Sequence, residues 1–130
     1  MKTLGIMLNF DGNAKQAADF YSMVFESPIV QVQTYADAQI PGFEDKILYA
    51  EIHIGGTKVM LSDCPPQITH KPGENFIMSY SNDCFDDLKK IFGLLAEGGA
   101  ISAPLEKTFF SELYGMVVDK FGIIWNIIHN

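Results

Sequence analysis

The chain has few basic residues and no long apolar run, and each shortage excludes a class of partner. Nine Lys and Arg stand against sixteen Asp and Glu, which gives a formal net charge of −7. Nucleic acids and anionic membrane surfaces are bound through clustered basic residues, so neither is expected as a partner. No segment approaches the roughly 20 consecutive apolar residues of a transmembrane helix. We therefore expect no nucleic acid and no membrane among the partners.

Cysteine is also scarce, with only Cys64 and Cys84 in 130 residues. A chain of this length can bury its own core, and intracellular chains of this kind keep their thiols reduced. The segment Met1–Asn9 is apolar but is too short for a signal peptide and lacks a small-residue cleavage site. It therefore reads as a strand. These features predict a cytoplasmic protein with two free thiols.

A β-hairpin is the clearest local signal. Asp119-Lys120-Phe121-Gly122 carries Asp at its first position and Gly at its fourth, as short turns prefer. The apolar runs Tyr114–Val118 and Ile123–Ile128 flank it. A Gly55-Gly56 pair marks a second hairpin in the first half of the chain. Glu112 and Asp119 are expected to be solvated loop or turn residues, and most aromatic residues, including Phe109 and Phe110, to lie in the core.

The first half of the chain predicts one helix and four strands. Ala17, Phe20, Tyr21 and Val24 recur at spacings of three and four, which is typical of an amphipathic helix. Asn13 is the expected N-cap. The predicted elements are a helix at Ala14–Phe25 and strands at Thr3–Phe10, Ile29–Tyr35, Lys46–Ile54 and Thr57–Ser62.

The second half repeats this order after a polar linker at about residues 65–73. Asn82 or Asp83 is the expected cap of its helix, and Gly98-Gly99 the expected end. The predicted elements are a helix at Cys84–Ala96 and strands at Asn75–Ser81, Ala100–Glu106, Tyr114–Val118 and Ile123–Ile128. Each half alone would leave one apolar sheet face uncovered. The pattern therefore predicts an α+β single domain, residues 1–130, in which two βαβββ modules (about 1–64 and 74–130) form a curved eight-stranded mixed sheet with helices on its outer face.

Motifs spread over nearly the whole chain carry a family resemblance. They are Asn9–Ala14 with Phe20-Tyr21, Ala50–Ile52 with Ile54–Gly56, Met60–Asp63, Ala96–Gly99, Thr108–Phe110, Tyr114-Gly115 and Asp119–Trp125. In these motifs the chain resembles the vicinal oxygen chelate superfamily, which includes glyoxalase I and bleomycin-resistance proteins. It is most similar to the PhnB-like branch, also called 3-demethylubiquinone methyltransferase-like. The resemblance implies a homodimer.

The activities that this resemblance suggests find little support in the residues. A methyltransferase that uses S-adenosylmethionine would show a Gly-rich turn after its first strand, and Asn9–Asn13 has a single glycine. The superfamily's usual metal ligands fall near Leu4 or Ile6, Met60, Phe76 and Asn126. Only Asn126 offers an oxygen donor, so we expect no cofactor and no metal at that site, and no metal-dependent glyoxalase activity.

A small-molecule site is the favoured interpretation. Tyr49, Glu51 and His53 alternate along one strand and so share one face. If Asn126 points into the cavity, alternation places Trp125 on the helix-packed face. The predicted ligand-binding residues, in a mostly apolar cavity, are Tyr49, Glu51, His53, Met60, Phe76 and Asn126. Two alternatives stay open: a metal-dependent lyase, isomerase or dioxygenase-type enzyme with a relocated site at Glu51 and His53, and a structural or regulatory dimer with a filled cavity.

Overall fold

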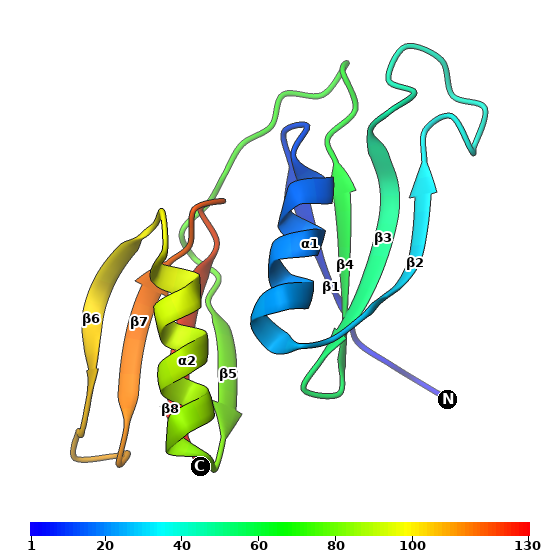
Figure 1. The fold of residues 1–130 in the computed structure, drawn as a ribbon. Coiled ribbons are helices and arrows are strands. Elements are labelled where there is room, and N and C mark those ends of the chain that lie inside the picture. Colours follow the sequence, from blue (N-terminus) through cyan, green and yellow to red (C-terminus); the bar gives the residue numbers. More distant parts are fainter. The chain divides into compact units, whose positions relative to one another are not determined.

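Each half of the chain folds as its own unit in the computed structural model, which describes residues 1–130 (Figure 1). The N-terminal unit comprises Met1–Lys71 and the C-terminal unit Pro72–Asn130. Both repeat one order of elements, so the predicted α+β fold of two βαβββ modules is confirmed. The elements are β1 Ile6–Phe10, α1 Ala14–Phe25, β2 Ile29–Thr34, β3 Ile47–Ile54, β4 Thr57–Asp63, β5 Met78–Asn82, α2 Phe85–Ala96, β6 Ala100–Glu106, β7 Tyr114–Val118 and β8 Ile124–His129.

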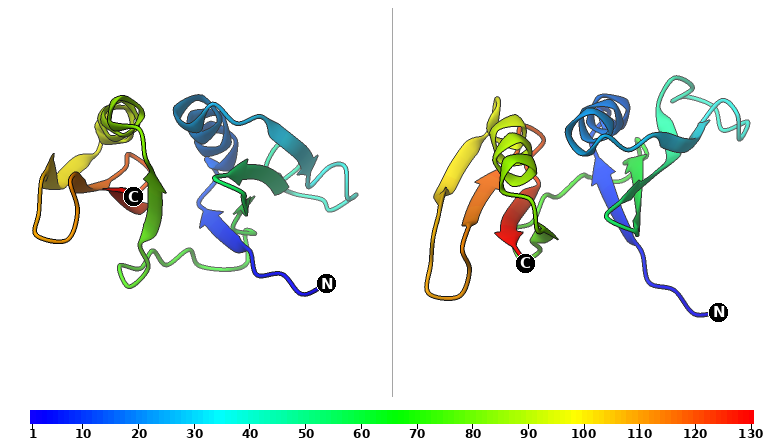
Figure 2. Two further views of the ribbon diagram at one scale, coloured as in Figure 1. Left: turned by 90° about the horizontal axis from the view of Figure 1, so that it is seen from below. Right: turned by 60° about the horizontal axis from the view of Figure 1, so that its bottom comes forward.

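Hydrogen bonding groups the eight strands into two mixed sheets of four. The strand orders are β1-β4-β3-β2 in the N-terminal unit and β5-β8-β7-β6 in the C-terminal unit. In each sheet the first and last strands of the module pair in parallel, and the other pairs are antiparallel. Each helix lies across one face of its own sheet (Figure 2). The opposite face of each sheet is therefore left without a helix, and we call it the open face.

The edge strands begin later than the sequence predicts. Strand β1 starts at Ile6 rather than Thr3, and β5 starts at Met78 rather than Asn75. Both strands lie at the edge of a sheet and pair with one neighbour only, so their length is set by where that neighbour offers a partner. Pairing begins at Ile6 with Val59 and at Met78 with Trp125.

Helix α1 has the predicted bounds, but its N-terminus is capped differently from the prediction. The side chain of Asn13 makes no capping hydrogen bond. Instead the N–H of Ala14 donates to Oδ1 of Asp63 at 3.0 Å, and the N–H of Ile47 donates to Oδ2 of the same carboxylate at 2.9 Å. The buried Asp63 therefore connects the start of α1, the start of β3 and the end of β4.

Asp119 is buried, so the prediction of a solvated turn residue is wrong. The turn itself is confirmed, because the N–H of Gly122 donates to the carbonyl of Asp119 at 2.9 Å. The Asp119 side chain accepts N–H groups from Phe121 and Ile123 at 2.9 and 3.0 Å. Its other oxygen accepts the indole N–H of Trp125. Two backbone N–H groups and one indole N–H thus donate to this carboxylate. Because its oxygens are hydrogen-bonded within the protein, the carboxylate can be buried.

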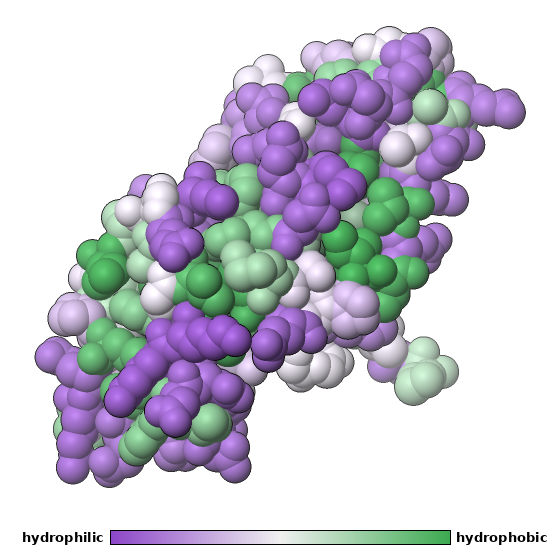
Figure 3. Space-filling view, in the orientation of Figure 1, coloured by the Kyte–Doolittle hydropathy of each residue, from purple (hydrophilic) through white to green (hydrophobic).

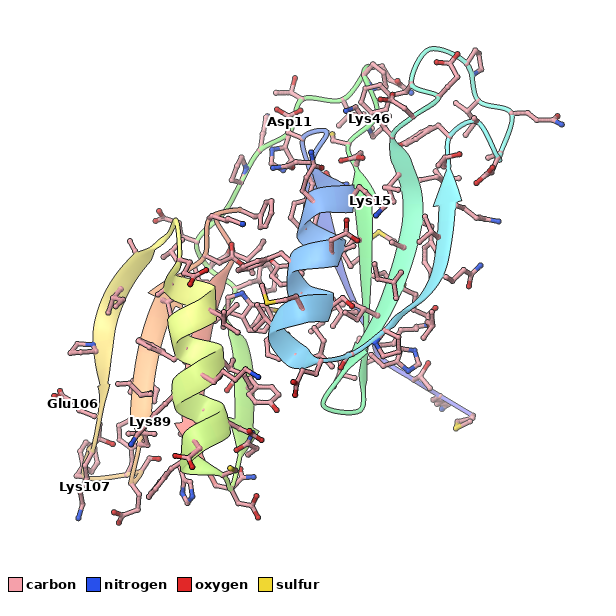
Figure 4. All side chains as sticks on the ribbon, viewed as in Figure 1. Asp11, Lys15, Lys46, Lys89, Glu106 and Lys107 are labelled. Atoms are coloured by element: carbon pink, nitrogen blue, oxygen red, sulfur yellow. The ribbon has the colours of Figure 1, made fainter.

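One apolar area stays on the surface of the N-terminal unit. The space-filling view shows it over β2 and β3 (Figure 3), where Val30 and Val32 are exposed at the sheet edge. Charged side chains lie around the start of α1, among them Asp11, Lys15 and Lys46 (Figure 4). The Lys46 ammonium donates to the carbonyl of Gly12 at 3.1 Å and so holds the loop that precedes the helix. No helix has the length and apolar composition needed to cross a membrane.

Candidate functional site

The open face of the N-terminal unit carries a chain of hydrogen-bonded polar side chains on β3. Successive strand residues point to opposite faces, so Ala50, Ile52 and Ile54 are buried. Tyr49, Glu51 and His53 occupy the other face, as the alternation predicted. The Tyr49 hydroxyl donates to Oε1 of Glu51 at 2.6 Å, and Nε2–H of His53 donates to Oε2 at 2.5 Å. One carboxylate therefore joins three neighbouring side chains.

These contacts shift the titration of two groups. Hydrogen bonds from Tyr49 and then His53 favour the ionised carboxylate, so the pKa of Glu51 is lowered from 4.5. The hydrogen bond between Tyr49 and Glu51 also raises the pKa of the Tyr49 phenol above 10.0, because only the neutral phenol can donate it. Burial adds to this rise. At neutral pH the cluster therefore holds an anionic Glu51 and a neutral Tyr49.

The His53 side chain is more exposed to solvent than the Glu51 side chain. The Glu51 side chain is 16% exposed, and the His53 side chain is 54% exposed. Each carboxylate oxygen can accept more than one hydrogen bond, and each accepts only one from these two neighbours. The cluster can therefore receive a further donor from a ligand, while Tyr49 and His53 fix the orientation of the carboxylate.

Apolar and polar groups surround this cluster. Met60 on β4 lies opposite Glu51 in the register and is also opposite Met7 on β1. Beside them, Nδ2 of Asn9 donates to Oγ of Ser62 at 3.0 Å. Thioether side chains adapt to irregular shapes, so this arrangement suits a ligand with an apolar body and a polar end.

Sequence reasoning missed several neighbours of the cluster on the same face. Gln31 and Gln33 on β2 lie opposite Glu51 and Tyr49, and Lys58 on β4 lies opposite His53. The alternation of valine and glutamine along residues 30–33 is a signal that could have identified the glutamines. The face is consequently more polar than the expected cavity lining.

Asn126 lies on the open face of the other sheet, in the C-terminal unit. Its register partners are Met116 on β7 and Ser79 on β5. Trp125, the preceding residue, is buried on the helix side, as predicted. The Oδ1 atom of Asn126 is buried and has no hydrogen-bond partner. An unpaired buried acceptor costs free energy, so this amide oxygen is a candidate acceptor for a ligand donor.

Phe76 does not belong to either sheet face. The sequence placed it on a strand, but β5 begins two residues later, and the Phe76 side chain is 82% exposed in the segment before it. The structure thus brings Tyr49, Glu51, His53 and Met60 together on one face and leaves Phe76 outside that group.

The residues at the superfamily's metal positions do not fit a metal. Ile6 pairs with the buried Val59 and so belongs to the helix side of the sheet, whereas Gly5 and Met7 alternate onto the open face. Neither of these offers a nitrogen or oxygen side-chain donor, and Met60 offers only a thioether. No group of three or more His, Cys, Asp and Glu side chains is placed to hold an ion. We derive no chemistry through a metal at these positions.

Neither thiol belongs to the polar cluster. Cys64 is buried, and its Sγ donates to the carbonyl of Ile68 at 3.2 Å. Cys84 is exposed at the start of α2, where its backbone N–H donates to the Asn82 side chain at 2.8 Å. Both cysteines are unpaired. Neither contributes to the candidate site.

Comparison with known families and proteins agrees with this architecture. The model of the family described as 3-demethylubiquinone-9 3-methyltransferase matches residues 2–128. Protein YjdN of Escherichia coli is 24% identical over 135 residues, which cover 92% of this chain and 90% of that protein. An uncharacterised protein of Mycobacterium bovis is 28% identical over 88% of this chain and 75% of its own length.

Solved structures extend the similarity to the fold. The crystal structure of protein PA1353 from Pseudomonas aeruginosa has a TM-score of 0.94 and 27% identity, covering 100% of this chain and 98% of that one. A PhnB protein from Bacillus cereus, described as a putative 3-demethylubiquinone-9 3-methyltransferase, has a TM-score of 0.79 and 28% identity, covering 99% and 100%. A glyoxalase-related enzyme from Fulvimarina pelagi shares the fold alone, with a TM-score of 0.68 and 17% identity over 100% of this chain and 89% of that one.

Proposed function

The chain belongs to the 3-demethylubiquinone-9 3-methyltransferase family, a PhnB-like branch of the vicinal oxygen chelate superfamily, and on that basis we propose that it binds a small molecule without using the superfamily's usual metal site. The resemblance read from the sequence is thereby confirmed at the level of the family. The proposed binding surface is the open face of the N-terminal unit around Tyr49, Glu51, His53 and Met60.

One observation carries this proposal: the Glu51 carboxylate is held by Tyr49 on one oxygen and by His53 on the other. Side chains ordered in this way lose less conformational freedom when a ligand arrives. The ligand that suits them has a hydrogen-bond donor for Glu51 and an apolar part for Met60. Asn126 is a second proposed ligand residue, in the C-terminal unit, because its buried Oδ1 lacks a partner.

Methyl transfer is not part of the proposal, although the family name mentions it. A doubly wound nucleotide-binding sheet is mostly parallel, whereas each sheet here contains a single parallel pair. We further propose that residues 1–130 act as one domain, that the protein is a cytoplasmic homodimer, and that the segment at about 65–73 serves as a linker. The net charge of −7 supports the absence of a nucleic-acid partner.

The alternative enzyme would use Glu51 and His53 as ligands of a relocated metal. Imidazole and carboxylate are suitable donors, and the two side chains are adjacent. Against it, each of these groups is already bonded to the other, and no third His, Cys, Asp or Glu completes a set. The other alternative, a structural or regulatory dimer, predicts that no small molecule binds.

The first experiment is the metal content of the protein purified without a histidine tag, measured by mass spectrometry. It is followed by titration with Zn²⁺, Ni²⁺, Mn²⁺ and Fe²⁺. Near-stoichiometric metal that is lost in Glu51→Gln would overturn the metal-independent proposal in favour of the relocated site. Absence of metal, with no rise of melting temperature on adding any ion, would support it.

The second experiment is a screen of small molecules for a rise in melting temperature. A ligand of the proposed site should raise the melting temperature of the wild type and lose that effect in Glu51→Gln. Glu74→Gln is the matched control, because Glu74 is an exposed carboxylate of the C-terminal unit and is not part of the proposed surface. A ligand that stabilises Glu51→Gln as much as the wild type would contradict the assignment of the site.

A further inference from the structure

The loop between β6 and β7 borders a surface cavity in the C-terminal unit, on different elements from the polar cluster. We call residues 107–112 the aromatic loop. It starts at Lys107, directly after Glu106 at the end of β6 (Figure 4). It borders an open surface cavity of about 400 Å³, which is within the size range of small-molecule pockets. The cavity is lined by Lys107, Thr108, Phe109, Phe110, Ser111, Glu112, His129 and Asn130.

Hydrogen bonds hold this loop in one conformation. The N–H of Thr108 donates to the carbonyl of Ser111 at 2.9 Å, and the N–H of Ser111 donates to Oγ1 of Thr108 at 3.1 Å. The Ser111 hydroxyl lies 2.9 Å from the carbonyl of Leu113 and 3.1 Å from that of His129. The loop is therefore tied to the end of β8.

Two aromatic rings of this loop, Phe109 and Phe110, and the ring of Tyr114 at the start of β7 contact one another in a row. Phe109 and Phe110 meet edge to face with centroids 5.2 Å apart, and Phe110 meets Tyr114 in the same way at 5.0 Å. Phe109 is 101% exposed and Phe110 is 54% exposed. Phe109 and Phe110 are therefore exceptions to the expectation that most aromatic residues lie in the core. The outermost ring presents a face that another ring could cover.

Charged groups stand at the two ends of the loop. The Lys107 ammonium lies 3.6 Å from Oε2 of Glu112, and both side chains are largely exposed. Since the two charges pair with each other, the cavity has no excess of either sign from this loop. A ligand selected by the rings alone is consistent with that balance, whereas a strongly charged ligand would have to displace one partner of the pair.

We infer that this cavity binds a small planar aromatic molecule, which stacks on Phe109 and Phe110. The size of the cavity, the ordered loop and the row of aromatic rings carry this inference together. It does not depend on the polar cluster of β3, so either assignment can fail while the other holds.

Indole is a suitable probe, and its binding to the full chain can be followed by ¹H–¹⁵N correlation spectra. We expect indole to shift the amide signals of residues 107–112. Phe109→Ala should weaken indole binding about tenfold, because it removes the stacking surface. Ile68→Ala is the control, since it also removes an exposed apolar side chain but lies in the other unit, and it should leave the indole affinity unchanged.

Three results would overturn the inference. Indole binding that is equal in Phe109→Ala and wild type would exclude the stacking surface. Cyclohexanol shifting the same signals with equal affinity would show general apolar binding and no preference for aromatic rings. A lower sedimentation coefficient in Phe109→Ala, without an effect of indole on the wild type, would show that the ring is instead a contact between two copies of the chain.

Discussion

The indole Nε1–H of Trp125 donates to Oδ2 of Asp119 at 2.9 Å, and both side chains are buried. Trp125 belongs to β8, and Asp119 belongs to the turn that leads into it. The other oxygen of the carboxylate accepts the backbone N–H groups of the turn. Asp119 thus accepts both the backbone hydrogen bonds of the hairpin turn and the indole hydrogen bond of the only tryptophan of the chain.

Replacing this carboxylate by an amide tests the relationship. Asp119→Asn keeps an oxygen for the turn but directs an amino group at the indole N–H, so two donors face each other. We expect a loss of about 1–3 kcal/mol in the free energy of unfolding. Urea unfolding followed by far-ultraviolet circular dichroism measures it. In a Trp125→Phe background, where the indole donor is absent, the same substitution should cost less; an equal cost would refute the pairing.

The buried Asp63 should be equally sensitive to loss of charge. In Asp63→Asn one side-chain oxygen becomes an amino group that faces the N–H of either Ala14 or Ile47. We expect the free energy of unfolding to fall by about 1–3 kcal/mol, measured by far-ultraviolet circular dichroism in urea. Asp45→Asn provides the control, because that side chain is exposed, and should change stability by less than about 0.5 kcal/mol.

The titration of Tyr49 reports the hydrogen bond to Glu51. Glu51 is the largest cause of the raised pKa of Tyr49. In Glu51→Gln we therefore expect the Tyr49 pKa to fall toward 10.0, as measured by phenolate absorbance. The difference between each protein and its Tyr49→Phe partner isolates this one group among the five tyrosines. A Tyr49 pKa that stays unchanged would mean that burial alone raises it.

Acid should remove the contribution of Glu51 to stability. Its pKa is lower in the folded protein than the ordinary 4.5, so its contribution is fully present above pH 4.5. That contribution is lost as the pH falls through the lowered pKa. The difference in unfolding free energy between wild type and Glu51→Gln should be larger at pH 7 than at pH 3. Urea unfolding at the two pH values measures this, and a difference that grows in acid would contradict it.

Two glycines of the C-terminal unit should respond oppositely to alanine. A Cβ at Gly115 would lie 2.7 Å from the Phe92 ring and 3.0 Å from Cα of Leu105, so Gly115→Ala should cost about 1–3 kcal/mol. Gly93 lies inside α2 with nothing within 4 Å of such a Cβ, and Gly93→Ala should stabilise by about 1 kcal/mol. The melting temperatures of both variants test these expectations. A lower melting temperature of Gly93→Ala would contradict the open space around a Cβ at that position.

Local patterns predicted the elements well. Helix Ala14–Phe25 has the predicted bounds because its apolar spacing is a local signal. The shared face of Tyr49, Glu51 and His53 follows from strand alternation alone. Edge-strand ends were not predictable in this way, because the start of β5 depends on a partner 47 positions along the chain. Phe76 was misplaced for this reason.

Hydrogen bonds made by side chains account for the errors at Asn13 and Asp119. Asp63 caps a helix that begins 49 residues earlier. The sequence around Asn13 therefore gives no sign that the Asn13 side chain does not cap this helix. The burial of Asp119 depends on three donors converging on one carboxylate, which residue type alone does not reveal. Phe109 lies in a loop that hydrogen bonds between Thr108 and Ser111 close, and its residue type alone does not signal its exposure.

The parallel pairing of first and last strands sets an order of events during synthesis. Residues 6–10 must wait for residues 59–63 before β1 has a neighbour, and residues 78–82 must wait for residues 125–129. All four strands of the N-terminal sheet can therefore pair while the C-terminal unit is still being translated. The C-terminal sheet can be completed only when β8 has emerged, so a ribosome stalled shortly before β8 would carry one complete sheet and one unfinished sheet.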